Sequence, residues 1–285
     1  LQALNMAETI ASQGTDRLLH ADVLNGLGLL HWNCGRLDEA RTCFVHSLRR
    51  LPRHGDPARR GQVANNLGIL TEELGHLPVA ERYYQKAFTV FDRTGVRRSR
   101  AYSLGNLANL YRHGARYERA REAYEEVETE LRVMGESHAA AYTVGNIGDL
   151  ERDFGDWESA RKRYEAALDF ARAACDEELK AECYARIAQL QLLAGRLDLM
   201  PRMLKKAETA ATQASSQEFS IYSQILTGEL EIEKRRTIAA RHRIESAGTA
   251  ARQVGLVYYQ LWSEHALARL DVVSADLGSA RKRCH

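Results

Sequence analysis

A ladder of small residues at a step of forty constrains the fold of this chain more than any other feature. It runs along nearly the whole sequence through Gly28, Gly68, Ala108, Gly148, Ala188, Gly228 and Ala268. Twelve residues after each rung stands a second one, usually alanine, at Ala40, Ala80, Ala120, Ala160, Met200, Ala240 and Ala280. Four residues further on comes a large apolar residue, at Phe44, Tyr84, Tyr124, Tyr164, Leu204 and Ile244. A fixed period of this length indicates a repeat architecture, in which each unit buries its apolar face against its neighbours.

The spacing inside each unit predicts two antiparallel helices. Apolar residues recur at i, i+3, i+4 and i+7 on each side of a turn, which is the pattern of an amphipathic helix. Gly75 is expected to take the left-handed conformation that ends the first helix of its pair. Small residues at Gly68 and Ala80 allow the two helix axes to approach closely, and Tyr84 is expected to fill the space beside them. The chain is therefore predicted to be all-α, a solenoid of antiparallel helix pairs.

Six full pairs are expected, over residues 18–56, 58–96, 98–136, 138–176, 178–216 and 218–256. Residues 1–14 are predicted to form a lone second helix, and residues 258–285 a partial repeat that stops inside its second helix. The chain has four prolines among 285 residues and no Ser/Gly/Pro-rich linker, which predicts one continuous array over residues 1–285. Because the array begins and ends within a repeat, we expect it to come from a longer polypeptide.

Composition and the amino-terminal segment predict a cytoplasmic protein. The chain is 45% hydrophobic with a formal net charge of +2, which is typical of globular proteins. It has no apolar run long enough to span a membrane, and its start lacks the basic and apolar regions of a signal peptide. The cysteines are odd in number and irregularly spaced, which indicates reduced thiols and no disulfide framework.

The repeat resembles a known family. The spacing of Leu107-Ala108, Tyr111, Ala115-Arg116-Tyr117, Ala120 and Tyr124 is similar to that of the tetratricopeptide repeat. The period is forty instead of the usual thirty-four, and the proline that normally ends each repeat is absent. Long repeats with Gly-Asn-Leu in the first helix look like those of kinesin light chains and of sensor regions in bacterial signalling proteins. The resemblance implies a right-handed superhelix that binds peptides or proteins and has no catalysis of its own.

In the resembling family, the first helix of each pair lines the concave face. Applied to this chain, the resemblance predicts a peptide-binding groove formed by Asn66, Tyr102, Asn106, Asn109, Tyr142, Asn146, Asp149 and Arg186. Asn66, Asn106 and Asn146 share one position in three successive repeats. A carboxamide offers both a donor and an acceptor, so it can pair with a peptide backbone whatever the ligand's side chains are.

A purely structural role remains open for these side chains. The three asparagines could instead form hydrogen bonds between adjacent helices and stiffen the stack. Tyr102 and Tyr142 could contact a ligand, as tyrosine often does at interfaces, or could pack between repeats.

Charge along the first helices favours a basic partner. Eight carboxylates stand against four arginines there, the acids being Asp22, Glu72, Glu73, Asp149, Asp153, Glu182, Glu229 and Glu233. The arginines are Arg112, Arg152, Arg186 and Arg269, and we expect about half of the charges to pair across repeats. A ligand with lysine, arginine or a free amino group is then favoured electrostatically. A separate arginine ridge is predicted at two inter-repeat turns, from Arg49, Arg50, Arg53, Arg59, Arg60, Arg93, Arg97, Arg98 and Arg100.

The sequence offers no case for catalysis, a cofactor or a metal. It has no phosphate-binding loop, and Gly26-Leu27-Gly28 lies in a predicted helix with no preceding strand. His31, Cys34, Cys43 and His46 have metal-like spacing, but the last two fall on an outward face of the repeat. We therefore interpret the chain as a non-catalytic scaffold for a peptide or protein segment, the sensor or interaction region of a larger signalling protein. Two alternatives remain: a regulatory module that holds an attached protease or NTPase domain, and a nucleic-acid binder that uses the arginine ridge.

Overall fold

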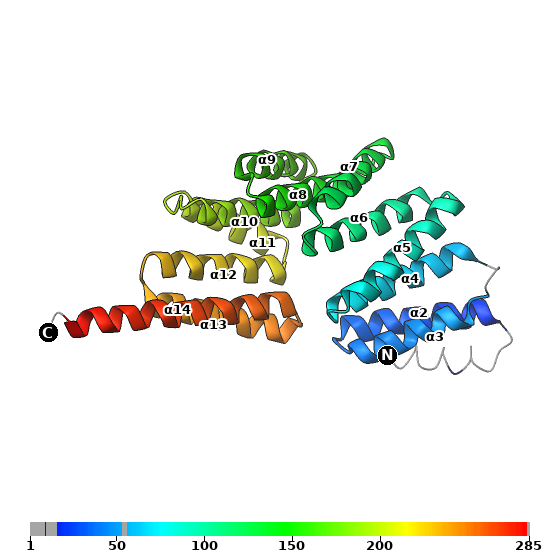
Figure 1. The fold of residues 1–285 in the computed structure, drawn as a ribbon, viewed down its shortest axis with the longest axis horizontal. Helices are drawn as coiled ribbons and strands as arrows, with labels where there is room; N and C mark the ends of the chain where they lie inside the picture. The colour runs from blue at the N-terminus through cyan, green and yellow to red at the C-terminus, as the bar shows by residue number, and fades with distance from the viewer. Residues whose placement is uncertain (1–8, 10–15, 53–55, 284–285) are drawn as a thin grey trace. The chain divides into compact units, whose positions relative to one another are not determined.

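A computed structural model describes residue 9 and residues 16–52 and 56–283, with side chains up to residue 275. Within that part of the chain there are thirteen α-helices and no strand (Figure 1). The first helices of the repeats are α2 (Arg17–Asn33), α4 (Pro57–Glu73), α6 (Arg97–His113), α8 (Ser137–Phe154), α10 (Glu177–Leu193), α12 (Gln217–Glu233) and α14 (Val257–Arg283). The second helices are α3 (Leu37–Arg50), α5 (Leu77–Thr94), α7 (Tyr117–Val133), α9 (Trp157–Ala173), α11 (Met200–Gln213) and α13 (Thr237–Val254). The all-α prediction and its helix pairs are confirmed.

The chain divides into two compact units, Leu1–Thr143 and Val144–His285, which are called unit 1 and unit 2 below. The division falls inside α8, so it does not coincide with the end of a repeat. In unit 1 the helices of each pair pack together, α2 with α3, α4 with α5 and α6 with α7. In unit 2 the pairs α10–α11 and α12–α13 do the same, and α14 packs on α13 and α12 (Figure 1).

Close contact between the small residues and the large apolar ones forms the core, as the ladder predicts. A Cβ added at Gly68 would lie 2.5 Å from the ring of Tyr84, and one added at Gly148 would lie 2.7 Å from the ring of Tyr164. Ala80 and Tyr84 are buried in unit 1, and Tyr164 is buried in unit 2. Only glycine lets the second helix approach the first so closely that an aromatic ring covers the backbone.

Left-handed residues end the helices at regular positions. The turns inside the pairs have positive φ at Gly35, Gly75, Ala115, Gly155, Gly195 and Arg235. The turns between pairs have it at Gly95, Gly135, Cys175, Ser215 and Gly255. The prediction for Gly75 is confirmed, with φ of 77°. The sequence prediction does not include the left-handed residues of the turns between pairs. Two of these five residues, Cys175 and Ser215, are not glycine, so no regular glycine marks these turns in the sequence.

The repeat that begins at α10 and the last repeat differ from the others. Pro201 lies in the first turn of α11, which begins later in its repeat than the other second helices do. The turn expected inside residues 258–285 is absent, and α14 continues as one helix from Val257 to Arg283. The position where this turn was expected holds Ala275, a strong helix former, and no glycine is present there to take the left-handed conformation. The lone helix predicted for residues 1–14 lies outside the described residues, apart from residue 9.

Candidate functional site

In unit 1, asparagines on successive first helices are joined by hydrogen bonds. Asn66 Nδ2 on α4 donates to Asn25 Oδ1 on α2 at 3.1 Å. Asn106 Nδ2 on α6 donates to Asn65 Oδ1 on α4, also at 3.1 Å, and Ser103 Oγ donates to the same oxygen at 3.2 Å. Both amide bonds link residues forty-one apart in the sequence, because the same register recurs in each repeat. We call this set of side chains the amide ladder.

The amide ladder serves the stack and still leaves a polar group accessible. Asn66 and Asn106 are both half-buried. Each donates one hydrogen bond to the preceding repeat, and no described residue donates to the carboxamide oxygen of either one. The hydrogen bonds fix the orientation of both carboxamides, so each oxygen is held in place while it remains accessible.

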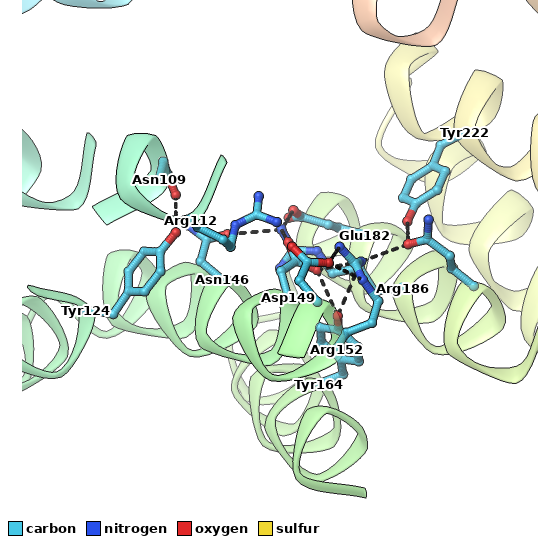
Figure 2. Close-up of polar contacts among 12 residues, drawn as sticks. Asn109, Arg112, Tyr124, Asn146, Asp149, Arg152, Tyr164, Glu182, Arg186 and Tyr222 are labelled. Carbon is cyan, nitrogen blue, oxygen red and sulfur yellow. Dashed lines mark hydrogen bonds and ion pairs between the residues drawn. The ribbon is translucent and has the colours of Figure 1, made fainter. Parts of the chain in front are cut away.

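Buried tyrosines on the second helices form hydrogen bonds with the first helices. Tyr124 OH donates to Asn109 Oδ1 at 2.5 Å, and Tyr164 OH donates to Asp149 Oδ1 at 2.8 Å (Figure 2). The equivalent of these acceptors in the preceding repeat is the apolar Ile69, and Tyr84 OH donates to Glu72 Oε2 at 2.7 Å instead. Burial raises the pKa of the Tyr164 phenol, so it stays protonated and donates. Asn109 and Asp149, both predicted groove residues, therefore also have structural partners.

In unit 2, four charged side chains of α8 and α10 form a buried cluster. Arg152 Nη1 lies 2.9 Å from Asp149 Oδ1. Arg186 Nη2 lies 2.6 Å from Glu182 Oε1 and 3.3 Å from Asp149 Oδ2. Asp149 is 7% exposed, Glu182 8% and Arg186 9%, so these three side chains are almost closed to solvent. Figure 2 shows how they converge with Arg152. Its two carboxylates and two guanidinium groups balance, as buried charges must.

Burial shifts the pKa values of this cluster. Burial raises the pKa of Glu182 above its ordinary value of 4.5, and the nearby Arg186 only partly opposes that shift. Burial also acts to lower the pKa of Arg186, but Asp149 and Glu182 outweigh it and keep that pKa well above its usual value. Arg186 therefore stays charged, and Glu182 ionises at a higher pH than an exposed carboxyl group does.

Arg186 occupies the same repeat position as Asn66, Asn106 and Asn146, and it makes the equivalent contact with the preceding repeat. Its Nη2 donates to Asn146 Oδ1 at 3.1 Å. The residue forty-one positions earlier is Gly145, and a Cβ added there would collide with Arg186 Nη1. The long side chain of Arg186 thus fills the space that Gly145 leaves open. At the equivalent position in unit 1, Asn66 contacts a second asparagine, Asn25. Gly145 is absent from the sequence prediction, although its place forty-one residues before Arg186 could have indicated it.

The cluster continues to α12 through a glutamine. Arg152 Nη1 donates to Gln189 Oε1 at 2.8 Å, and Tyr222 OH donates to the same oxygen at 2.9 Å. Tyr222 is buried and its ring packs against those of Tyr259 and Trp262. One polar network therefore connects α8, α10 and α12.

The acidic side chains along the first helices are paired more completely than the sequence suggests. Asp22 lies 2.5 Å from Arg59, Glu73 Oε2 accepts from Trp32 Nε1 at 2.7 Å, and Asp153 pairs with Arg152. In unit 2, Glu229 and Glu233 both pair with Arg269. With the contacts of Glu72, Asp149 and Glu182 given above, all eight predicted acids have a partner. The electrostatic preference for a basic ligand is weakened accordingly.

The two predicted groove tyrosines differ in exposure. Tyr102 is 41% exposed, and the guanidinium of Arg98 lies 5.7 Å from its ring centre. Tyr142 is half-buried beside His138, with ring centres 4.9 Å apart. Tyr102 therefore offers the larger free aromatic surface of the two.

Known proteins identify the repeat family. A family model of the tetratricopeptide repeat matches residues 19–93 and 59–129. Residues 19–129 of the chain are tetratricopeptide repeats. No curated protein matches the sequence. The helix pairs and their ladders described above extend the same repeat unit through residue 254.

Solved structures of similar fold include three proteins with low sequence identity to this chain. A Rap conjugation gene regulator of plasmid pLS20, in complex with the Phr* peptide, has a TM-score of 0.66 at 12% identity. The match covers 94% of this chain and 78% of that one. A signal-transduction ATPase from Pyrococcus horikoshii with a tetratricopeptide repeat sensor has a TM-score of 0.65 at 13% identity, covering 89% of this chain and 41% of that one. Kinesin light chain repeats from Podosopora anserina have a TM-score of 0.57 at 14% identity, covering 71% and 100%. At these identities the likeness concerns the fold.

Most of the predicted arginine ridge in this repeat protein is engaged in internal contacts. Arg59 pairs with Asp22 and Asp56, and Arg60 donates to the carbonyl oxygens of Leu48 and Leu51. Arg97, Arg98 and Arg100 pair with Glu130, Glu136 and a set of three acids, respectively. Arg53 lies outside the described residues. Five of the nine ridge arginines therefore have internal partners, which weakens the case for a nucleic-acid surface.

The next two features are metal sites and membrane-spanning helices. Among the described residues, no group of three or more His, Cys, Asp or Glu side chains is placed to hold a metal ion. The same residues include no helix that is both long and apolar enough to cross a membrane.

Proposed function

We propose that this tetratricopeptide-repeat protein is a non-catalytic scaffold that binds a peptide or protein segment along its first helices. The observation that carries the proposal is the amide ladder, whose Asn66 and Asn106 carboxamides are fixed by one hydrogen bond each and keep an accessible oxygen. The similar fold of a Rap regulator in complex with a Phr* peptide supports the same use of the scaffold.

The chemistry of the ladder suits an extended peptide. A carboxamide oxygen accepts a hydrogen bond from a backbone N–H of the ligand, regardless of the ligand's side chains. Since each carboxamide is already held by the stack, little side-chain entropy is lost on binding. Tyr102, which is largely exposed on the same helix as Asn106, adds an aromatic contact.

Within this proposal the predicted groove residues have two roles. We assign five of them to ligand contact, because none is fully buried: Tyr102 is exposed, and the other four, Asn66, Asn106, Tyr142 and Asn146, are half-buried. Asn109, Asp149 and Arg186 hold buried tyrosines and neighbouring helices, and we assign them to support of that surface.

The proposal includes a setting in a larger signalling protein. There the repeats would act as the sensor or interaction region, and the partner would be an external segment or a domain of the same polypeptide. Support comes from the fold similarity to an ATPase whose tetratricopeptide repeats are described as a sensor. A basic partner remains part of the proposal, although the pairing of the acids leaves it less electrostatic support.

Peptide selection tests the binding function directly. Random peptides displayed on phage would be selected against the wild-type chain, and the affinity of each selected peptide measured by fluorescence anisotropy. Asn106→Ala should weaken binding about 2- to 10-fold, the value of one hydrogen bond. Thr129→Ala, an exposed position on α7, is the matched control and should bind as wild type does. Peptides that bind Asn106→Ala and a Tyr102→Ala variant as tightly as wild type would remove the first-helix face as the binding site.

A further inference from the structure

A second surface in unit 2 carries an independent binding site. An open pocket of about 510 Å³ is lined by residues from the end of α9, the start of α10 and α11. Five of its ten lining residues are basic and one, Glu177, is acidic, so the lining carries a net charge of +4. The basic residues are Arg172, Lys180, Arg202, Lys205 and Lys206.

Three of these cations have no carboxylate partner. Lys180 lies 2.8 Å from Glu177 and Arg172 lies 3.0 Å from Asp169, so those two are neutralised locally. Arg202, Lys205 and Lys206 form no ion pair with any described residue. Unpaired like charges repel one another and favour an anionic occupant.

The unpaired cations form one stripe on α11. Arg202, Lys206, Thr209 and Gln213 follow one another at steps of three or four, and Lys205 lies three residues after Arg202, which places them on one helix face. The stripe spans twelve residues of helix, from 202 to 213, a length of about 16 Å. An extended chain of about five residues has the same length. The stripe therefore matches a short extended segment, and its open shape differs from the enclosed apolar sites of small molecules.

A tyrosine forms the centre of the pocket. The ammonium group of Lys206 lies 5.2 Å from the ring centre of Tyr184, and Arg172 Nη2 donates to the Tyr184 hydroxyl at 3.5 Å. The half-buried Tyr184 thus contacts one cation through its ring and another through its hydroxyl. It is the one aromatic residue of the lining, whereas single-stranded nucleic acid is usually bound by several aromatic platforms.

We propose that the α9–α10–α11 pocket binds an extended acidic peptide segment of a partner protein, with its carboxylates placed along Arg202, Lys205 and Lys206. The site is distinct from the first-helix face and does not depend on the function proposed for that face. A scaffold with both sites would hold two protein segments at once.

The test uses the whole chain and a fluorescein-labelled oligoglutamate peptide, with an oligoglutamine peptide of equal length as the neutral probe. Binding is measured by fluorescence anisotropy at low and high salt. We expect oligoglutamate to bind wild type, oligoglutamine not to bind, and the affinity to fall as salt rises. The double variant Lys205→Glu/Lys206→Glu should weaken oligoglutamate binding at least about tenfold.

A matched variant separates the pocket from net charge. Lys162→Glu/Arg252→Glu changes the charge by the same amount at exposed positions of α9 and α13 outside the pocket, and should keep wild-type affinity within about twofold. Equal losses in the two double variants, or no oligoglutamate binding at low salt, would overturn the proposal. Tighter binding of a single-stranded oligonucleotide of equal charge would reassign the pocket to nucleic acid. Loss of self-association in the pocket variant alone, seen by sedimentation without peptide binding, would reassign it to a second copy of the chain.

Discussion

Arg186 and Gly145 share one space: the guanidinium of Arg186 lies where a side chain at position 145 would be. In unit 1 the same register is filled by pairs of asparagines, Asn66 with Asn25 and Asn106 with Asn65. The repeat thus keeps one contact between successive first helices and changes the chemistry that makes it. With a glycine below it, the longer arginine reaches Asp149, Asn146 and Glu182 together.

Gly145→Ala should destabilise the protein by about 1–3 kcal/mol, because the new methyl group displaces a buried guanidinium from its carboxylates. Urea unfolding followed by circular dichroism measures the loss. Gly105→Ala is the matched control, since a Cβ there meets only Val127 at 4.0 Å. Alanine in that helix should stabilise the protein by about 0.5–1 kcal/mol. Equal effects of the two substitutions would show that Arg186 moves away without loss.

Glu182→Gln should change how stability depends on pH. Because the folded state raises the pKa of Glu182 above 4.5, the wild type favours folding with this group protonated and loses that stability as pH rises through the raised pKa. The variant lacks this loss, so its stability relative to wild type should increase from about pH 4.5 upward. Urea unfolding over this pH range measures the difference, with the exposed Glu178→Gln as control. A relative stability that falls with pH would mean that the ionised Glu182 stabilises the fold.

The amide ladder can be tested by a double-mutant cycle. Asn65→Ala and Asn106→Ala each remove the hydrogen bond between α4 and α6, and the double variant removes it once. We expect a coupling free energy of about 0.5–1.5 kcal/mol from thermal and urea unfolding. Asn65 with Asn109 makes a control pair, because Asn109 bonds to Tyr124 instead. Additive effects in the Asn65–Asn106 cycle would show that this bond adds nothing to the stack.

Arg235→Gly should stabilise the protein by about 1 kcal/mol. Arg235 has φ of 56°, a left-handed conformation that the equivalent turns at Gly35, Gly75, Gly155 and Gly195 give to glycine. The measurement is the change in melting temperature. Arg236→Gly is the neighbouring control: its φ of −92° is open to any residue, so glycine there adds freedom to the unfolded chain, removes the contact with Glu231 and should destabilise. A lower melting temperature for Arg235→Gly would mean that its side-chain contacts outweigh the backbone strain.

The sequence by itself determined the repeat, the helix pairs and the contact of small residues with large ones. Those features follow from periodic spacing, and a glycine such as Gly68 has one place in that period, under the ring of Tyr84. It also identified which first-helix residues are polar, including Asn106 and Arg186. The tertiary structure decided what those polar groups do. Whether a carboxamide meets Asn25, or a guanidinium meets Asp149 above Gly145, depends on the stagger between successive helices. The continuous α14 has both a local and a tertiary cause: Ala275 stands where most other repeats have a left-handed glycine, and Val273 packs against the α13 side chains without a turn.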